Sequence, residues 1–263
     1  MQGSANLNIM IKAARKAGRS LNKDFREVEN LQTSATNAEE FVSRAAKAAG
    51  AILHEDLTGA RGTYGYVEPA GEAEGEDPTR RWIVNPIEGT TNFLHGQPHF
   101  AVSIALEHKG QIVSAVVFDP AKDEMFYAEK GAGAWLNDNK RVRVSSRHRL
   151  VESVLGHVVP FGVKRTLPAT LKDLACVMPE CSGMRASGSS ALDLAYVAAG
   201  RIDGYWQREG VLTDLAAGVL IAAEAGALVE GVRAGQTPLE HGSILCANNQ
   251  IFAALAKVIR TTD

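Results

Sequence analysis

Apolar residues recur at three- and four-residue spacing in two stretches near the start of the chain. In residues 7–25 the positions Leu7, Met10 and Leu21 share one face, and lysines and arginines lie between them. A similar pattern covers residues 39–57 and ends where glycines follow. Apolar positions at this spacing form a stripe along one side of a helix, so the pattern predicts two amphipathic helices.

Short β-rich runs follow an acidic loop at residues 71–77. They cover residues 82–84, 100–106, 112–118, 124–128 and 134–136, and turn residues separate them. Such runs predict an antiparallel meander. The basic stretch at residues 140–149 could form an anion-binding surface, but its alternation of charge with Val142 and Val144 favours a half-exposed strand.

Strands and helices alternate in the second half of the chain. The pattern predicts strands at residues 153–159, 227–230 and 244–247, and helices at 171–177, 190–199, 213–224 and 250–259. The fold class is therefore α/β, with an α+β N-terminal half and an α/β C-terminal half. We place a boundary between residues 1–148 and 149–263 and expect the two halves to pack tightly and share a cleft.

Composition excludes several classes of protein. The formal net charge of -2 offers no basic field for nucleic acid, so a small-molecule partner is the better expectation. No apolar run is long enough to span a bilayer, and Asn8, Lys12 and Arg15 interrupt the N-terminal apolar positions. Three cysteines without metal-type pairing fit reduced thiols, so we expect a cytoplasmic protein.

The most informative segment reads WIVNPIEGTTNF and covers residues 82–93. A hydrophobic strand runs into Asn85 and Glu88 and then into the turn Gly89-Thr90-Thr91. Side-chain oxygens at a strand end can hold Mg²⁺, and amides of a glycine-containing turn can face phosphate. Spacing alone slightly favours a plain strand-to-helix turn in which a threonine caps the helix and Glu88 is solvated.

The segment WIVNPIEGTTNFLHG resembles the signature of inositol monophosphatases, usually Asp-Pro-Ile-Asp-Gly-Thr-Thr-Asn. Three further stretches agree in order and spacing: YGYVE, which ends at Glu68, GSSALD at residues 188–193, and LTDLAAG at residues 212–218. On these motifs the chain is identified as a member of that family, of the bacterial extragenic-suppressor type. The resemblance implies the layered αβαβα fold of sugar phosphatases.

The resemblance also implies an activity, which is Mg²⁺-dependent hydrolysis of inositol monophosphate or a similar sugar phosphate. Metals in such sites activate the attacking water and neutralise the phosphoryl oxygens. Family members are commonly homodimers. Carried over by motif, the catalytic residues are Glu68 and Thr90; the metal ligands are Glu68, Asn85, the Ile87 carbonyl, Glu88 and Asp214; the phosphate-binding residues are Gly89, Thr90 and Thr91; and Gly188, Ser189, Ser190 and Gln207 face the polyol.

Each of these residues also has a plainer interpretation. Asp214 stands at the start of an apolar helix, where the helix dipole favours an acid. Glu68 could be an ordinary surface charge, residues 188–190 a helix cap, and Gln207 a satisfied polar residue. Their joint occurrence in the family's order favours the functional interpretation.

The departures from the family pattern gather at the metal site. Asn85 and Glu88 stand where the signature has aspartates, and Gln207 replaces a glutamate that faces the substrate. Pro69, Thr213 and Ala46 replace, respectively, an acid, a tryptophan and a helical aspartate. Losing carboxylates weakens Mg²⁺ binding, so we expect weakened or absent phosphatase activity. The alternatives are a non-catalytic regulatory or structural protein with a protein partner, and a related sugar-bisphosphatase or nucleotide-phosphate phosphatase.

Overall fold

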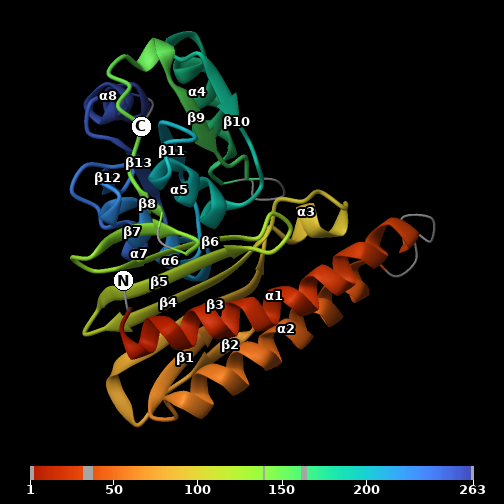
Figure 1. Cartoon of the computed structure of the whole chain (residues 1–263). Coiled ribbons are helices and arrows are strands. Elements are labelled where there is room, and N and C mark those ends of the chain that lie inside the picture. Colours follow the sequence, from red (N-terminus) through yellow and green to blue (C-terminus); the bar gives the residue numbers. More distant parts are fainter. Residues whose placement is uncertain (1–2, 32–37, 139, 161–164, 262–263) are drawn as a thin grey trace.

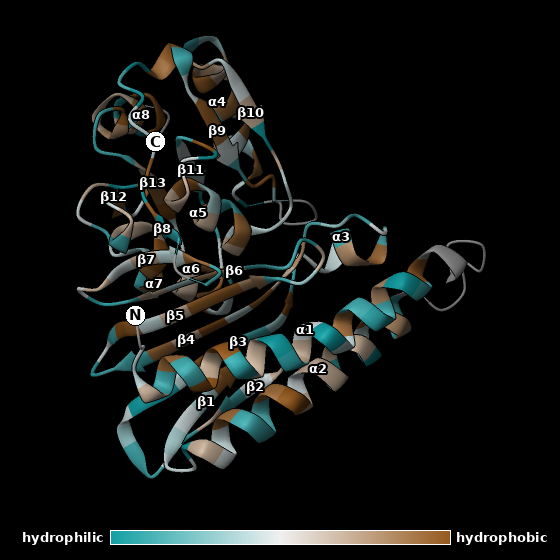
Figure 2. Ribbon diagram, viewed as in Figure 1, coloured by the Kyte–Doolittle hydropathy of each residue, from teal (hydrophilic) through white to brown (hydrophobic). Residues whose placement is uncertain are grey.

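The computed structural model describes residues 3–31, 38–138, 140–160 and 165–261. Helices α1 (Ala5–Leu31) and α2 (Ala38–Ala60) form the first layer and lie side by side across one sheet (Figure 1). Both predicted N-terminal helices are confirmed and extend further at each end. Met10, Leu21 and Leu53 are fully buried against the sheet, while polar residues cover the solvent side of α1 (Figure 2).

The first sheet has the strand order β2-β1-β3-β4-β5-β6-β7-β8. From β3 to β8 every neighbouring pair is antiparallel, which confirms the predicted meander. The strands are β1 (Tyr64–Glu68), β2 (Gly71–Ala73), β3 (Asp77–Glu88), β4 (Ala101–His108), β5 (Gln111–Asp119), β6 (Glu124–Glu129), β7 (Gly133–Leu136) and β8 (Lys140–Val142).

Two predictions for this sheet need correction. The acidic segment 71–77 is not all loop, because β2 lies within it and pairs antiparallel with β1. The basic stretch 140–149 is a strand only over β8, although the Val144 amide still donates to the Ala225 carbonyl at 3.1 Å. No signal in the sequence marks β2, because all three of its residues are exposed and show no alternation. After β8, the Val144 amide bonds to Ala225 of another element instead of to a neighbouring strand.

The second sheet has the order β10-β9-β11-β13-β12. Its strands are β9 (Val154–His157), β10 (Gly183–Arg185), β11 (Gly204–Gln207), β12 (Ala227–Glu230) and β13 (Ile244–Asn248). The remaining helices are α3 (Thr90–Leu94), α4 (Leu167–Val177), α5 (Ser190–Ala198), α6 (Leu212–Glu224), α7 (Pro238–His241) and α8 (Phe252–Arg260), with 3₁₀ turns η1 (Leu150–Glu152) and η2 (Met178–Glu180).

Four buried apolar clusters lie between five layers. One joins α1 and α2 to the first sheet, and a second joins the other face of that sheet to α5 and α6. A third lies between α5 and α6 and the second sheet, and a fourth joins that sheet to α4 and α8. Each layer therefore buries its apolar faces against its neighbours. The α/β class and the αβαβα layering are confirmed.

The two sheets divide the chain between Val142, where β8 ends, and Val154, where β9 begins. The predicted boundary at 148/149 lies in this interval, and the division into two domains stays a prediction. No helix within the described residues is both long and apolar enough to cross a membrane.

Candidate active site

The signature segment forms the end of β3 and the turn into α3. The pairing of β3 with β4 shifts register between Asn85 and Glu88, which re-aims the side chains at the strand end. Gly89 follows in the left-handed region, with φ 88° and ψ 41°. A Cβ there would lie 3.1 Å from the His99 carbonyl oxygen and 3.3 Å from that of Gly188, so the turn requires glycine.

A cavity of about 770 Å³ opens at this strand end. Its walls come from α2, the end of β1, the end of β3 and the start of α6. Seven of the predicted site residues line it, from segments far apart in the sequence: Glu68, Asn85, Ile87, Glu88, Gly89, Thr90 and Asp214. The size is that of a pocket for a small organic ligand.

Five of the predicted substrate-binding residues do not line this cavity. Thr91 is exposed on α3, and Gly188 is exposed in the turn before α5. Ser189, Ser190 and Gln207 are buried behind the cavity wall. Their contact with a polyol stays a prediction.

Asn85 and Asp214 are joined by a direct hydrogen bond. The Asn85 amide nitrogen, Nδ2, donates to Asp214 Oδ1 at 2.8 Å, and the backbone amide of Ile87 donates to Asn85 Oδ1 at 3.2 Å. A carboxylate only accepts, so the amide must turn its nitrogen toward Asp214. Burial raises the pKa of Asp214, while the bonds from Asn85 and Thr213 oppose that rise.

Both carboxyl oxygens of Glu88 accept from the start of α5. The Ser189 hydroxyl donates to Oε2, and the Ser190 amide donates to Oε1 at 2.8 Å. Glu88 is almost fully buried, and burial together with the nearby Asp214 carboxylate raises its pKa to about 8. Burial and the Asp214 carboxylate thus disfavour the charged form of Glu88.

Both polar atoms of the Gln207 side chain form hydrogen bonds within the protein. Its Oε1 accepts from the Ser190 hydroxyl at 2.9 Å and from the Tyr205 hydroxyl at 2.7 Å, and its Nε2 donates to the Glu209 carbonyl at 2.7 Å. These bonds tie α5 to the end of β11. The arrangement matches the plainer interpretation of Gln207 as a satisfied buried polar group.

The sequence matches the Inositol monophosphatase family over residues 4–262. The chain belongs to this family. It is 49% identical to the protein named Inositol-1-monophosphatase of Rhizobium meliloti, over 99% of this chain and 98% of that protein. It is 40% identical to the protein named Nus factor SuhB of Vibrio cholerae, over 97% of this chain and 95% of that protein. The crystal structure of extragenic suppressor protein suhB from Bartonella henselae has a TM-score of 0.89 at 42% identity, covering 98% of this chain and 99% of that one.

The inositol monophosphatase family generally depends on metal ions, and the side chains of this chain do not fit such ions as arranged. An Asn85 N–H points at Asp214, and Glu88 gives both its oxygens to α5. Mg²⁺ demands near-octahedral oxygen ligands and dehydrates reluctantly. Across the described residues, no group of three or more His, Cys, Asp or Glu side chains is arranged to hold a metal ion.

One wall of the cavity was not predicted from the sequence. Helix α2 contributes Ser43, Ala46, Lys47, Gly50, Ala51, His54 and Glu55. These positions recur at three- and four-residue spacing, so they share one helix face, and this period was the available signal. The helix lies close to β3, because a Cβ on Gly50 would be 3.3 Å from the Pro86 side chain. The wall thus brings the side chains of Lys47 and His54 to the cavity.

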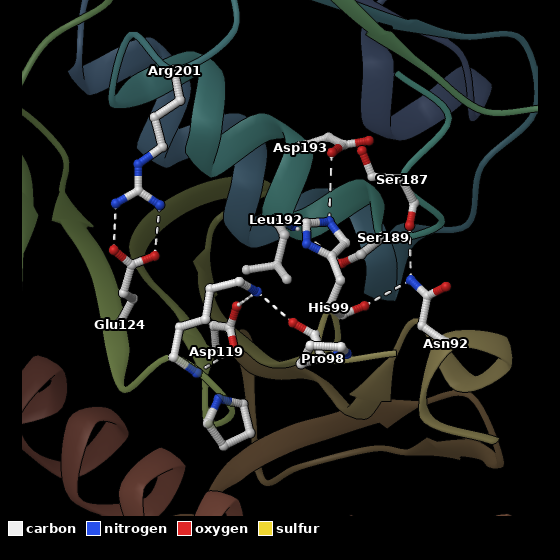
Figure 3. A network of polar contacts seen from close by, with 12 residues as sticks. Asn92, Pro98, His99, Asp119, Glu124, Ser187, Ser189, Leu192, Asp193 and Arg201 are labelled. Carbon is white, nitrogen blue, oxygen red and sulfur yellow. Dashed lines mark hydrogen bonds and ion pairs between the residues drawn. The ribbon is translucent and has the colours of Figure 1, made fainter. Parts of the chain in front are cut away.

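Asn92, a signature residue without an assigned role, holds the segment that follows the Gly89–Thr91 turn. Its Nδ2 donates to the His99 carbonyl at 2.7 Å and to the Ser187 carbonyl at 2.8 Å (Figure 3). His99 Nε2 in turn lies 3.7 Å from Asp193 Oδ1 on α5 (Figure 3). These contacts join the β3–β4 connection to the segment before α5, so the inositol monophosphatase turn is held on both sides.

Proposed function

We propose that this chain is a sugar-phosphate phosphatase of the inositol monophosphatase type whose hydrolysis is severely weakened. The cavity and the Gly89–Thr90 turn would receive the phosphomonoester, with the amides of the turn facing phosphate oxygens. Inositol monophosphate or a similar phosphorylated polyol is the substrate class. The observation that carries the proposal is the hydrogen bond from Asn85 to Asp214 at the centre of the cavity wall.

That hydrogen bond supports weakened rather than ordinary activity. In the family, metals supply the charge that activates water and stabilises the leaving oxygen, worth several kcal/mol in the transition state. Here the amide takes up one oxygen of Asp214, and Glu88, with its raised pKa, is turned toward α5. What remains to the chain itself is binding: turn amides for the phosphate, and Lys47 on the cavity wall as a cation.

Hydrolysis of inositol 1-phosphate in a Mg²⁺ titration tests the proposal. We expect the natural chain to turn over far below the rates of about 1–10³ s⁻¹ that are typical of enzymes. The double variant Asn85→Asp/Glu88→Asp restores the family's acids and should raise kcat/KM at least about 100-fold, since misplacement of about 1 Å costs that much. Ordinary turnover by the natural chain at millimolar Mg²⁺ would overturn the proposal.

A second candidate is a non-catalytic role through a protein partner. It is favoured by the 40% identity to a protein named Nus factor SuhB, together with the altered metal ligands. Stable co-purification with a larger assembly, combined with no binding of inositol 1-phosphate and no gain in the double variant, would support it over the phosphatase. We also propose that the chain forms a homodimer and is cytoplasmic, whichever of the two functions holds. Light scattering after size-exclusion chromatography tests the dimer.

A further inference from the structure

A second cavity, of about 470 Å³, lies in the C-terminal half. Its lining is Arg165, Thr166, Ala169, Arg208, Val232, Arg233, Gln236, His241 and Ser243. Three of these side chains are guanidiniums and one is an imidazole, whereas none is a carboxylate. A cavity that gathers arginines without lining acids has the chemistry of an anion site.

The cavity is separate from the candidate active site because β11 presents alternate residues to opposite faces. Gln207 bonds to Tyr205 and Ser190 on the α5 side of the sheet. Arg208 follows and turns to the α4 and α8 side, where it meets Asp173 and the Ile259 carbonyl. Side chains of successive residues in an extended segment point to opposite faces, so Arg208 lines the second cavity while Gln207 faces α5.

Arg208 is held in a fixed orientation. Its Nε donates to Asp173 Oδ2 at 2.6 Å and its Nη2 donates to Asp173 Oδ1 at 2.7 Å, and the Asp173 side chain is fully buried. This bidentate pair neutralises one guanidinium and orders it at the cavity wall. The other two, Arg165 and Arg233, are exposed side chains at the same cavity.

Polar groups complete the lining. The Ser243 hydroxyl makes two long contacts with described residues, 3.4 Å from the Val232 amide and 3.5 Å from Gln236 Oε1. His241 Nδ1 lies 3.1 Å from the Thr237 carbonyl, which accepts only, so Nδ1 carries the hydrogen. Acids also contact lining residues: Asp173 pairs with Arg208, and the Glu209 carboxylate accepts from the Thr166 hydroxyl at 3.1 Å.

We propose that this cavity is a second binding site and that it takes a small phosphorylated ligand with two or more negative charges. A volume of about 470 Å³ exceeds what one phosphate group fills, so the ligand is a polyphosphate or a phosphorylated small molecule. Arg165 and Arg233 bind its charged groups, and Arg208 with Ser243 orients it. The site is independent of the proposed phosphatase activity.

The site is also linked to the active cavity through the backbone. The Gly210 amide donates to the Gly242 carbonyl at 2.6 Å, and a Cβ on Gly242 would lie 2.6 Å from the Gly210 carbonyl oxygen. Gly242 lies between His241 and Ser243 of the second cavity, and Gly210 precedes Val211 of the first. The backbone contact between Gly210 and Gly242 therefore joins the segments that line the two cavities.

Calorimetric titration with inorganic pyrophosphate in EDTA tests the site, at about 0.1 M ionic strength, where the Debye length is about 10 Å. We expect the double variant Arg165→Gln/Arg233→Gln to weaken binding at least about tenfold, because charge-assisted hydrogen bonds are lost. Arg19→Gln/Arg26→Gln removes the same net charge from exposed positions on α1 and is the matched control. It should keep the natural affinity.

Ser243→Ala supplies a second, smaller change and should weaken binding by about threefold to tenfold through one lost hydrogen bond. Thermal melting of each variant confirms that it is folded. Equal losses in the two arginine double variants would assign the effect to overall charge and overturn the proposal. So would pyrophosphate binding that persists unchanged in Arg165→Gln/Arg233→Gln, or no binding by the natural chain.

Discussion

Replacing Asn85 by aspartate should make the metal-free protein less stable. The amide nitrogen now donates to Asp214 at 2.8 Å. In Asn85→Asp that donor becomes a second carboxylate facing Asp214, with Glu88 close by. A pair of carboxylates at this separation cannot both stay ionised without a cation between them.

The size of the loss follows from the geometry. Two like charges about 4 Å apart repel by about 4 kcal/mol at an effective dielectric constant of about 20. The pair relieves part of this by taking up a proton, at about 1.4 kcal/mol per unit of pKa shift. The lost hydrogen bond to a charged group adds about 1.5–3 kcal/mol. We therefore expect Asn85→Asp to lose about 2–4 kcal/mol of unfolding free energy at pH 8 in EDTA.

Urea unfolding measures this directly. Near pH 5 the new acid is protonated and donates to Asp214, so the loss should fall to about 1 kcal/mol or less. Adding Mg²⁺ at about 100 times its Kd should return about 2.7 kcal/mol to the variant and nothing to the natural chain. Asn249→Asp, at an exposed position after β13, is the matched control. If Asn85→Asp is as stable as that control at pH 8 in EDTA, the reasoning about the Asn85–Asp214 pair is refuted.

Three further predictions concern stability measured by urea unfolding. The folded pKa of Glu88, about 8, lies above its ordinary 4.5, so the folded state binds more protons than the unfolded state between these pH values, and stability falls as pH rises from 4.5 to 8. The variant Glu88→Gln should flatten that fall. An unchanged pH profile would contradict the raised pKa of Glu88. Gly89→Ala forces a Cβ into a left-handed turn against two carbonyls and should cost about 1–3 kcal/mol, with a loss below about 0.5 kcal/mol counting against the strain. Leu21→Ala empties a fully buried position between α1 and the first sheet and should cost about 2–5 kcal/mol, whereas a negligible shift of the urea midpoint would show that the helix does not need this contact.

The spacing of apolar residues predicted the two N-terminal helices, because α1 and α2 each bury one apolar face against the first sheet. Short β-rich runs between turn residues predict the meander from β3 to β8. The strand β2 was not predicted, because Gly71, Glu72 and Ala73 are all exposed and show no alternation of buried and exposed positions. Its pairing with β1 comes from the neighbouring strand, which is information that a local window does not contain.

The sequence predicted which residues line the candidate site but not which hydrogen bonds their side chains form. Motif order brought Glu68, Asn85, Glu88 and Asp214 to one cavity, as the resemblance implied. The bond between Asn85 and Asp214 joins residues 129 positions apart, and only the fold decides which amide atom meets which oxygen. The α2 wall could have been found from helical spacing, whereas the turn of Glu88 toward Ser189 could not.

The changes at Asn85 and Glu88 make physical sense as a pair. A carboxylate at position 85 together with Asp214 and a shorter acid at 88 would leave three like charges that only cations could reconcile. The amide at 85 removes one of those charges and adds a donor for Asp214. The longer Glu88 reaches the Ser189 hydroxyl and the Ser190 amide, and its raised pKa favours the uncharged form over a second charge beside Asp214. Each reversion brings back an acid beside Asp214, so we expect the double reversion Asn85→Asp/Glu88→Asp to destabilise the metal-free fold by more than the sum of the two single reversions.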